Sequence, residues 1–393
     1  MSFLKSKSPK DAERKIDWVN SIFMTSTPIL AIGLLAYYIP THGIVWQDVA
    51  LFFFMYIATG MGVTAGYHRY YSHRSYDCHW TLQVFYLLFG AAAIQNSILK
   101  WGRDHRIHHQ KVDTYDDPYN IQEGFFWAHM GWIYYKAPKD RDFTCVPDLK
   151  RDKLVLLQDK YYLPILIAVG FGLPTLVGAA YGRPFAGFLF AGLFRAVFVQ
   201  HMTFFINSLA HFKYSGGQPY SIDNTARDSW WLAFLTYGEG FHNFHHRFGA
   251  DYRNGIRWYH FDPTKWWIRA FKYFGFVTRL TRYRDDMILK ARIETDMKRV
   301  QQQIASAPEK LSVRIEQRLE SAREQLEAAY ARWDDAKSRY KALKRSVFAS
   351  SVKARQQWKL RTKEYNFEFQ AAQARWALLI ATFSRFHGHH PLG

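Results

Sequence analysis

Residues 48–73 read DVALFFFMYIATGMGVTAGYHRYYSH, an apolar run that continues without a break into two histidines, His68 and His73. The apolar part, 48–67, has the ~20 residues that a helix needs to cross a ~30 Å hydrocarbon core. An apolar helix of this length predicts a membrane span. Because the histidines follow the span directly, they are expected to lie at one membrane face.

Three further segments, 21–39, 161–182 and 185–206, are apolar and of similar length. The mean hydropathy of −0.27 hides them, because the chain beyond Lys290 is polar. The sequence therefore predicts an all-α membrane protein with four transmembrane helices and a helical cap that holds the histidines.

The segment Trp80–Leu99 is also apolar, but it carries Gln95 and Asn96 and follows the second span closely. A fifth crossing would put the histidine motifs of the chain on opposite sides of the membrane. We therefore expect this segment to lie at the interface or within the cap, and not to span.

The distribution of positive charge predicts the orientation. With four spans, the basic leader (1–20), residues 68–160 and everything after 207 share one side, and the chain has 52 Lys and Arg against 33 Asp and Glu. The two connections on the other side are short, and Arg183 is the only Lys or Arg in them. Lys and Arg are enriched in cytoplasmic loops. The site and both termini are therefore expected in the cytoplasm, with the spans in a bacterial inner membrane or the endoplasmic reticulum.

The chain divides by composition into the leader 1–20, a membrane domain 21–289 and a tail 290–393. The tail is rich in Gln, Glu, Lys, Arg and Ala, which favour helix. Between Asp335 and Glu364 it has no acidic residue, so a basic face could meet anionic lipid headgroups, although a solvated helical face is the simpler interpretation. Nucleic acid is not expected as a partner of a membrane-tethered chain.

Eight of the 17 histidines fall in three short motifs, and the segment NSLAH adds one more histidine and an amide. The residues are His68 and His73 in HRYYSH, His105, His108 and His109 in HRIHH, His242, His245 and His246 in HNFHH, and Asn207 and His211 in NSLAH. On a helix, positions i, i+3 and i+4 share a face, so each H-x-x-H-H run is expected to aim its imidazoles at a common point. His68 and His73 are about 140° apart on an α-helix and converge only if the helix ends or bends between them.

Nine imidazoles at one membrane face would repel if protonated and would leave unpaired nitrogens if neutral, unless metal binds them. They exceed the four ligands of one tetrahedral zinc, and imidazole suits iron, so two iron ions are the economical count. Cys78 and Cys145 are too few and too far apart for an iron–sulfur cluster, a rubredoxin site or a disulfide framework. The other histidines, such as His42 and His129, are expected to be surface or hydrogen-bonded residues.

Several carboxylates lie near the histidine motifs. Glu239 precedes His242 by three residues and is expected to orient a ligand imidazole through a hydrogen bond and not to bind metal. Asp104, Asp116 and Asp117 could act in the same way, or could be capping or surface residues. Reduced iron can activate O2 to attack unactivated C–H bonds, and alkyl chains in membranes have such bonds. A narrow apolar tunnel is therefore expected among the spans.

The order H-x4-H, H-x2-H-H, N-S-x2-H and GEGFHNFHH, together with TAGYHRYYSH and WGRDHRIHH, resembles the membrane fatty-acyl desaturases of the stearoyl-CoA, or delta-9, type. The resemblance runs from about residue 20 to about residue 285. It implies that the nine histidines bind two irons and that Asn207 reaches one iron through a water molecule. The tail has no counterpart in the core of this family, and its role stays open.

The same resemblance implies a set of substrate-binding residues. Those matching the bend of the acyl chain are Gln95, Trp101 and Thr203, and Phe204 stands where animal members have Trp. Those matching the CoA headgroup site are Asn96, Arg103 and Asp104, with Lys136 near the phosphates. Tyr56 matches the residue that closes the tunnel, which implies an acyl chain of C16–C18 length.

The resemblance implies an O2-dependent enzyme that introduces a cis double bond at carbon 9 of a saturated acyl-CoA. The sequence has no Gly-rich dinucleotide fingerprint and no cysteine cluster, so electrons are expected from a separate protein of the cytochrome b5, ferredoxin or rubredoxin type. An acyl-lipid desaturase and a fatty-acid or alkane hydroxylase with a related site stay open as alternatives. A membrane scaffold that presents the tail to a partner is the non-enzymatic alternative.

Overall fold

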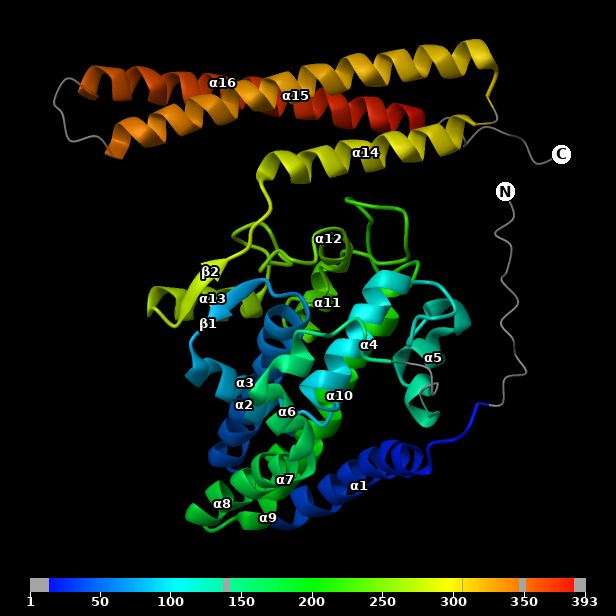
Figure 1. The fold of residues 1–393 in the computed structure, drawn as a ribbon, viewed down its shortest axis with the longest axis vertical. Helices are drawn as coiled ribbons and strands as arrows, with labels where there is room; N and C mark the ends of the chain where they lie inside the picture. Colours follow the sequence, from blue (N-terminus) through cyan, green and yellow to red (C-terminus); the bar gives the residue numbers. More distant parts are fainter. Residues whose placement is uncertain (1–13, 137–141, 306, 346–350, 385–393) are drawn as a thin grey trace. The chain divides into compact units, whose positions relative to one another are not determined.

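The computed structural model describes residues 14–136, 142–305, 307–345 and 351–384 of the chain (Figure 1). Contacts divide the chain into two units, Met1–Tyr283 and Arg284–Gly393. The first carries all the histidine motifs. Most of the predicted basic leader and the histidines near the C-terminus lie outside the described residues.

Four helices of the first unit are long and apolar enough to cross a membrane, as the sequence predicted. They are α1 (Trp18–His42); α2 (Trp46–Met61) continuing into the π-helix η1 (Gly62–Ser72); α7 (Tyr162–Ile167), η5 (Ala168–Gly172) and α8 (Leu173–Ala180) in one run; and α9 (Pro184–Ala186), η6 (Gly187–Phe194), α10 (Arg195–Ser208) and η7 (Leu209–His211) in another. The second and fourth extend beyond the predicted bounds, to Ser72 and His211, and so carry histidines at their ends.

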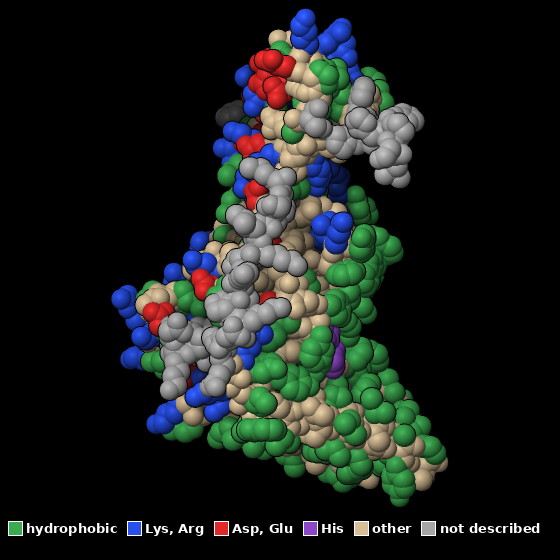
Figure 2. Space-filling view, turned by 90° about the vertical axis from the view of Figure 1, so that its right-hand side faces the viewer, with side chains coloured by type: hydrophobic (Ala, Val, Ile, Leu, Met, Phe, Trp, Pro, Cys, Tyr) green, Lys and Arg blue, Asp and Glu red, His purple; other side chains and the backbone are tan. Residues whose placement is uncertain are grey.

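Apolar side chains cover the outside of these helices. On α1, Ile22, Ile29 and Ile32 are 64 to 66% exposed, although an aqueous surface would not favour them. Figure 2 shows hydrophobic side chains over the lower part of the view, where the spans lie. This surface is the one that hydrocarbon would contact, and it makes the chain a multi-pass membrane protein.

The segment after the second span does not cross. Helix α3 (Trp80–Ala92) has 13 residues, too few to span, and it packs against η1 and α2, in agreement with the prediction. The approach to η1 is close, since a Cβ at Gly62 would lie 2.5 Å from the backbone nitrogen of Gly90. Glycine at position 62 therefore lets α3 lie directly against the helix that carries His68.

The cap is built from short elements around the ends of the spans. They are η2 (Ile121–Glu123), α5 (Phe125–His129), η3 (Gly131–Tyr134), η4 (Leu149–Arg151), α6 (Lys153–Lys160), α11 (Trp230–Leu235) and α13 (Pro263–Tyr273), with α4 (Ile98–Lys111) and α12 (His242–Arg247) carrying histidines. Ser97 caps α4, and Asp262 caps α13 by accepting a hydrogen bond from the Lys265 amide at 2.8 Å. An antiparallel pair of short strands, β1 (Tyr76–Cys78) and β2 (Val277–Leu280), was not predicted, but the fold class is mostly helical as expected.

The second unit consists of α14 (Asp285–Ile304), α15 (Glu309–Arg345) and α16 (Ser351–Ser384), which confirms a helical tail. The first tail helix begins at Asp285, five residues before the boundary at 290 that composition predicted. The apolar residues of α15 are too sparse for a heptad, yet Ile315, Leu319 and Leu326 are buried. Partners on α14 and α16, such as Val300 and Trp376, complete the core.

Candidate metal centre

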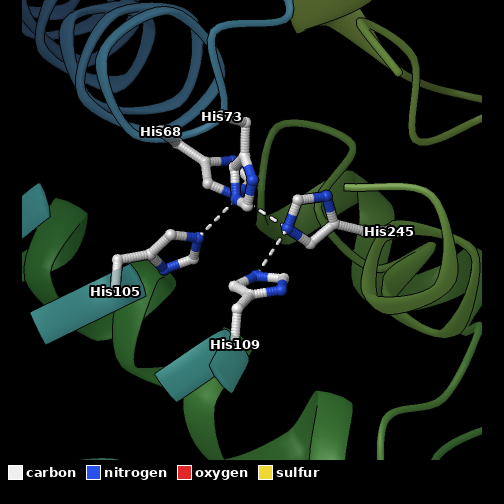
Figure 3. Close-up of side chains that lie close together, drawn as sticks. All are labelled: His68, His73, His105, His109 and His245. Atoms are coloured by element: carbon white, nitrogen blue, oxygen red, sulfur yellow. Dashed lines mark hydrogen bonds between the residues drawn. The ribbon is translucent and has the colours of Figure 1, made fainter. Parts of the chain in front are cut away.

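The nine motif histidines converge as two groups, in each of which one ring nitrogen from every histidine lies within 4.8 Å of those of the others. The first group is His68, His73, His105, His109 and His245 (Figure 3), and the second is His108, His211, His242 and His246. Two groups of five and four match the count of two metal ions expected from the sequence. The division between the two groups could not be read from the motifs.

The π-helix η1 brings His68 and His73 together. The backbone N–H of His73 donates to the carbonyl oxygen of His68 at 3.1 Å, an i to i+5 bond that widens the turn. Residues five apart therefore lie one above the other, and the two ring centroids are 4.8 Å apart. On an α-helix this spacing would require the chain to end or bend between the two histidines; the wider π turn brings them together instead.

Helices α4 and α12 each divide their three histidines between the two groups. At about 100° per residue, i+4 lies about 40° to one side of i, and i+3 lies about 60° to the other. On α4, His105 and His109 face the first group and His108 the second. On α12, His242 and His246 face the second group and His245 the first. The expectation that each run aims at one point is therefore wrong, because only the i and i+4 positions share a centre.

All close contacts within the groups join Nε2 atoms. In the first group, Nε2 of His245 lies 2.9 Å from that of His68 and 3.0 Å from that of His109, and the His73–His105 pair is 2.7 Å apart. In the second group, Nε2 of His242 lies 3.1 Å from those of both His211 and His246. Two imidazoles can share one proton, but larger sets leave lone pairs facing one another.

The imidazoles are held in the state that a metal requires. Burial, with neighbouring imidazoles adding to it, lowers the pKa of His105, His109, His242, His245 and His246 well below the ordinary value. The rings are therefore neutral at neutral pH, with Nε2 lone pairs aimed inward. A donor set of nitrogens without thiolates fits iron, zinc, copper or nickel, so the residues fit a pair of such ions.

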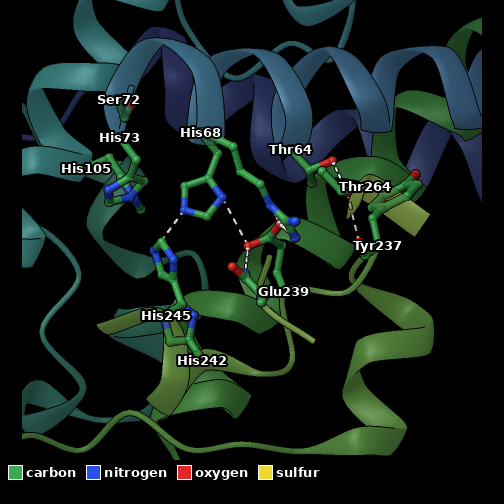
Figure 4. Close-up of polar contacts among 12 residues, drawn as sticks. Thr64, His68, Ser72, His73, His105, Tyr237, Glu239, His242, His245 and Thr264 are labelled. Atoms are coloured by element: carbon green, nitrogen blue, oxygen red, sulfur yellow. Dashed lines mark hydrogen bonds and ion pairs between the residues drawn. The ribbon is translucent and has the colours of Figure 1, made fainter. Parts of the chain in front are cut away.

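Glu239 lies beside His68, as Figure 4 shows, with Oε2 3.0 Å from Nδ1. Its other oxygen accepts from the guanidinium of Arg69 at 2.8 Å, and Arg69 in turn donates to Asp262 at 3.0 Å. All are 4% exposed or less. Burial raises the pKa of Glu239, but the Arg69 guanidinium and the hydrogen bonds from Arg69 and His68 outweigh it and lower the pKa to about 2. An ionised carboxylate therefore fixes the orientation of the His68 ring.

The second group has its own acceptors. Asp117 Oδ1 lies 2.8 Å from Nδ1 of His108, whereas Asp116 is at the surface, 4.0 Å from Lys111. Thr225 Oγ1 lies 2.8 Å from Nδ1 of His211 and donates to Asp113 at 2.7 Å. Since that hydroxyl hydrogen is committed to Asp113, the hydroxyl oxygen accepts from Nδ1–H of His211, which leaves Nε2 free for metal.

Four residues of these acceptor chains were missed by the sequence analysis: Arg69, Asp113, Thr225 and Asp262. Arg69 lies inside HRYYSH and Asp113 lies four residues after His109, so proximity to the motifs was the available signal. Thr225 and Asp262 have no motif, and only the folded chain brings them to the site.

Thr225→Val should weaken the second centre selectively. It removes the oxygen that accepts from His211 while keeping the shape of the side chain, and loss of such a partner costs about 10 to 100-fold in metal affinity. Metal titration of the purified protein would measure this, with Thr175→Val as a matched control, because the Thr175 hydroxyl donates only to the Phe171 carbonyl of its own span. Equal affinities of the two variants for the second ion would contradict the prediction.

Of the residues expected to bend an acyl chain, Trp101 lies next to the first group, and Gln95 and Thr203 are bonded to each other. Trp101 stacks on His105 with ring centroids 4.8 Å apart, and the amide of Gln95 donates to Thr203 Oγ1 at 2.9 Å. An apolar cluster of Val63, Ala93 and Val199 contacts both Trp101 and Tyr56. Tyr56 packs on the ring of Tyr237 at 4.9 Å. Apolar contacts thus connect Trp101, beside the histidines, with Tyr56 on α2.

The other predicted substrate residues lie elsewhere around the site. Phe204 contacts the buried His129 and the half-buried His201, whose ring nitrogens lie 3.0 Å apart. Arg103 donates to Asp104 at 2.9 Å, while Asn96 and Lys136 are exposed. Asn207 is half-buried on α10, one turn before His211.

Comparison with known proteins gives a consistent set of similarities. The family model described as fatty acid desaturase matches residues 44–282. "Acyl-CoA desaturase 1" of Saccharomyces cerevisiae is 38% identical over 289 residues, and "Probable acyl-CoA desaturase" of Schizosaccharomyces pombe is 40% identical over 288 residues. Each match covers 72% of this chain but only 56% and 59% of the two yeast proteins. "sn-1 stearoyl-lipid 9-desaturase" of Anabaena variabilis is 34% identical over 270 residues, which cover 68% of this chain and 94% of that protein.

Proposed function

Because this chain belongs to the fatty acid desaturase family, we propose that it is an O2-dependent enzyme that introduces a cis double bond at carbon 9 of a saturated C16–C18 acyl-CoA. The observation that carries the proposal is the division of nine imidazoles, six buried and three half-buried, into groups of five and four beside an apolar cluster. The names of the yeast relatives support an acyl-CoA substrate, and the name of the cyanobacterial relative supports carbon 9.

Two iron ions are the proposed cofactor. All-nitrogen ligands suit several metals. Removal of hydrogen from a methylene group requires a redox-active metal, and zinc has no redox chemistry. Bound iron, reduced by a donor protein, would supply the activation of O2. The overall reaction takes two hydrogens from adjacent methylenes with O2, two electrons and two protons, and it yields the double bond and two waters.

The protein itself would bind the metal ions, orient the acyl chain and exclude water from the reacting carbons. Nine imidazoles and the Asn207 amide would hold the ions, and Glu239, Asp117 and the Asp113–Thr225 pair orient three of the rings. Trp101, Gln95 and Thr203 would bend the acyl chain next to His105. The apolar cluster next to Tyr56 would exclude water from the reacting carbons. Asn96, Arg103, Asp104 and Lys136 would contact the CoA headgroup.

The orientation and the partners are part of the proposal. The scarcity of Lys and Arg in the connection between α1 and α2, and the basic residues on the histidine side, support a cytoplasmic site. Two electrons per turnover would come from a separate donor of the cytochrome b5, ferredoxin or rubredoxin type, because the described residues contain no further redox cluster. An acidic donor would be steered by the net charge of +19.

Fatty-acid analysis of host cells that express the chain tests the activity. Gas chromatography and mass spectrometry, with the double-bond position determined, should show new cis-9 C16 and C18 monoenes. Hydroxylated chains would point to the hydroxylase alternative, and no new product in the presence of iron and a donor would favour the scaffold. Assays of the purified protein with stearoyl-CoA and with stearoyl phospholipid would separate the acyl-CoA from the acyl-lipid alternative, which the Anabaena relative supports.

Tyr56→Ala should lengthen the accepted acyl chain. In this proposal the Tyr56 ring closes the acyl tunnel, and it packs against Tyr237 and Phe198 with ring centroids 4.9 and 5.4 Å away. Removal of the ring opens space for about two to four more methylenes, each worth about 0.8 kcal/mol when buried. Competition between C18 and C20 acyl-CoA substrates would measure the shift, with Tyr273→Ala as the exposed control. An unchanged preference would remove Tyr56 from the tunnel.

A further inference from the structure

Arg195 is a charged side chain in the middle of a membrane span. It lies in the span Pro184–His211 and is 0% exposed. Among the described residues it has no acidic partner, and its guanidinium donates to three carbonyl oxygens instead. An ionisable residue within a span is costly and generally marks a function.

The three carbonyls belong to three different elements. Nη1 donates to Ala92 at 2.6 Å, Nη2 to Gly170 at 2.9 Å, and Nε to Ala191 at 3.0 Å. Ala92 is the last residue of α3, so Arg195 meets one of the carbonyls that the end of that helix leaves without an intrahelical partner. The planar guanidinium fork can bridge three elements in this way, whereas a lysine ammonium cannot reproduce the geometry.

The turn that begins at Ala92 is strained. Ile94 has φ 59° and Asn96 has φ 77°, values in the left-handed region that non-glycine residues rarely adopt, least of all β-branched ones. Strain of this kind persists only where the surroundings enforce it. Two of the enforcing contacts come from α10: Arg195 donates to the carbonyl of Ala92, and the Gln200 amide donates to that of Ile94 at 2.9 Å. The N–H of Asn96 donates to the Tyr162 hydroxyl on α7 at 3.0 Å.

The same turn carries two of the residues proposed to contact substrate. Gln95 is bonded to Thr203, also on α10, and Asn96 follows directly. Val199 lies between Arg195 and Thr203 at i+4 spacing and belongs to the apolar cluster. One face of α10 therefore holds the turn and lines the proposed tunnel at the same time.

We propose that Arg195 is a positioning residue that selects the carbon at which the double bond forms. By holding the turn Ala92–Asn96 against α10, it sets the distance between the headgroup contacts and the bend beside the histidines. The inference rests on the proposed function. It concerns where along the acyl chain the reaction occurs, and not whether it occurs.

The test compares product positions from the full-length enzyme in membranes with a saturated C18 acyl-CoA. Arg195→Met should raise the share of monoenes with a displaced double bond about tenfold, since misplacement by about 1 Å has large effects on reacting geometry. Arg195→Lys should fall between Met and the wild type, because it keeps the charge without the fork. Iron content, measured in parallel, should stay unchanged.

Arg183→Met is the matched control. Arg183 also bridges carbonyl oxygens, those of His42 and Gly43 at 3.2 and 2.8 Å, but at the other end of the spans. It should lower thermal stability without moving the double bond. A slower Arg195→Met enzyme with the wild-type product distribution, or an equal displacement in Arg183→Met, would overturn the proposal.

A second variant decides the matter if Arg195→Met does not accumulate. Gln200→Leu removes the hydrogen bond to the Ile94 carbonyl and keeps Arg195, so it should displace the double bond in the same direction. An unchanged distribution in Gln200→Leu would then overturn the proposal. A wild-type enzyme that makes no monoene at all would refute the proposed function, which is a separate outcome.

Discussion

His108→Ala is expected to abolish desaturation and to remove one of the two metal ions. His108 is 3% exposed, and its Nε2 atom faces His246 at 3.3 Å within the group of four histidines. With only three imidazoles left in that group, the second centre should lose its ion, and the five-histidine group should keep its own. Loss of a ligand should exceed the ~10 to 100-fold effect of losing only its hydrogen-bond partner, so turnover should fall by more than ~100-fold.

Metal analysis and fatty-acid profiling of the same membranes would measure this effect. The spans and the first centre do not depend on His108, so the protein should accumulate normally and retain about half of its metal. His42→Ala is the matched control, because His42 is exposed and lies outside both histidine groups, and its ring contacts Tyr38 and Thr41. Near-normal activity in His108→Ala, or complete loss of metal, would contradict two separate centres.

Glu239→Leu is expected to destabilise the protein and weaken the first centre together. Glu239 is 1% exposed, and its carboxylate is the acceptor for His68, Arg69 and Asn254. An apolar residue of similar size leaves the buried guanidinium of Arg69 with one carboxylate in place of two and leaves Nδ1 of His68 without its acceptor. Removal of one partner from a buried ion pair costs about 3–5 kcal/mol.

Melting temperatures of the solubilised protein, with and without added metal, would measure both effects. Glu239→Gln should keep most of the stability by preserving size and an oxygen acceptor, but it should still lose metal affinity because the negative charge is gone. Asp77→Asn is the control. The Asp77 and Arg279 side chains are each 56% exposed, so their ion pair should contribute less than ~1 kcal/mol to stability. A melting temperature of Glu239→Leu equal to that of Asp77→Asn would disprove the role of this network.

The sequence was sufficient for the parts of the structure that depend on local properties. Length and hydropathy identified the four spans. Trp80–Leu99 was excluded because a fifth crossing would separate the histidine motifs, and its helix α3 has only 13 residues. The composition of the tail predicted helices, since helix propensity is a property of each residue in turn. The histidine motifs predicted metal binding because nine imidazoles have few other ways to satisfy their nitrogens.

The assignment of each histidine to a centre was decided only by tertiary structure. The five-residue spacing of His68 and His73 works through a π turn, which no motif announces. The runs on α4 and α12 divide their imidazoles because each helix faces both centres, and that depends on how the two helices pack. Thr225 and Asp262 reach the site from positions far along the chain.

The sequence alone therefore determined the class of the protein and the set of groups available to bind metal, since hydropathy and ligand chemistry reside in the residues themselves. Only the tertiary structure decided which nitrogens share a metal, which carboxylates orient them, and how α10 holds the turn beside them. These relations are distances between elements remote in sequence, and burial gives them their strength.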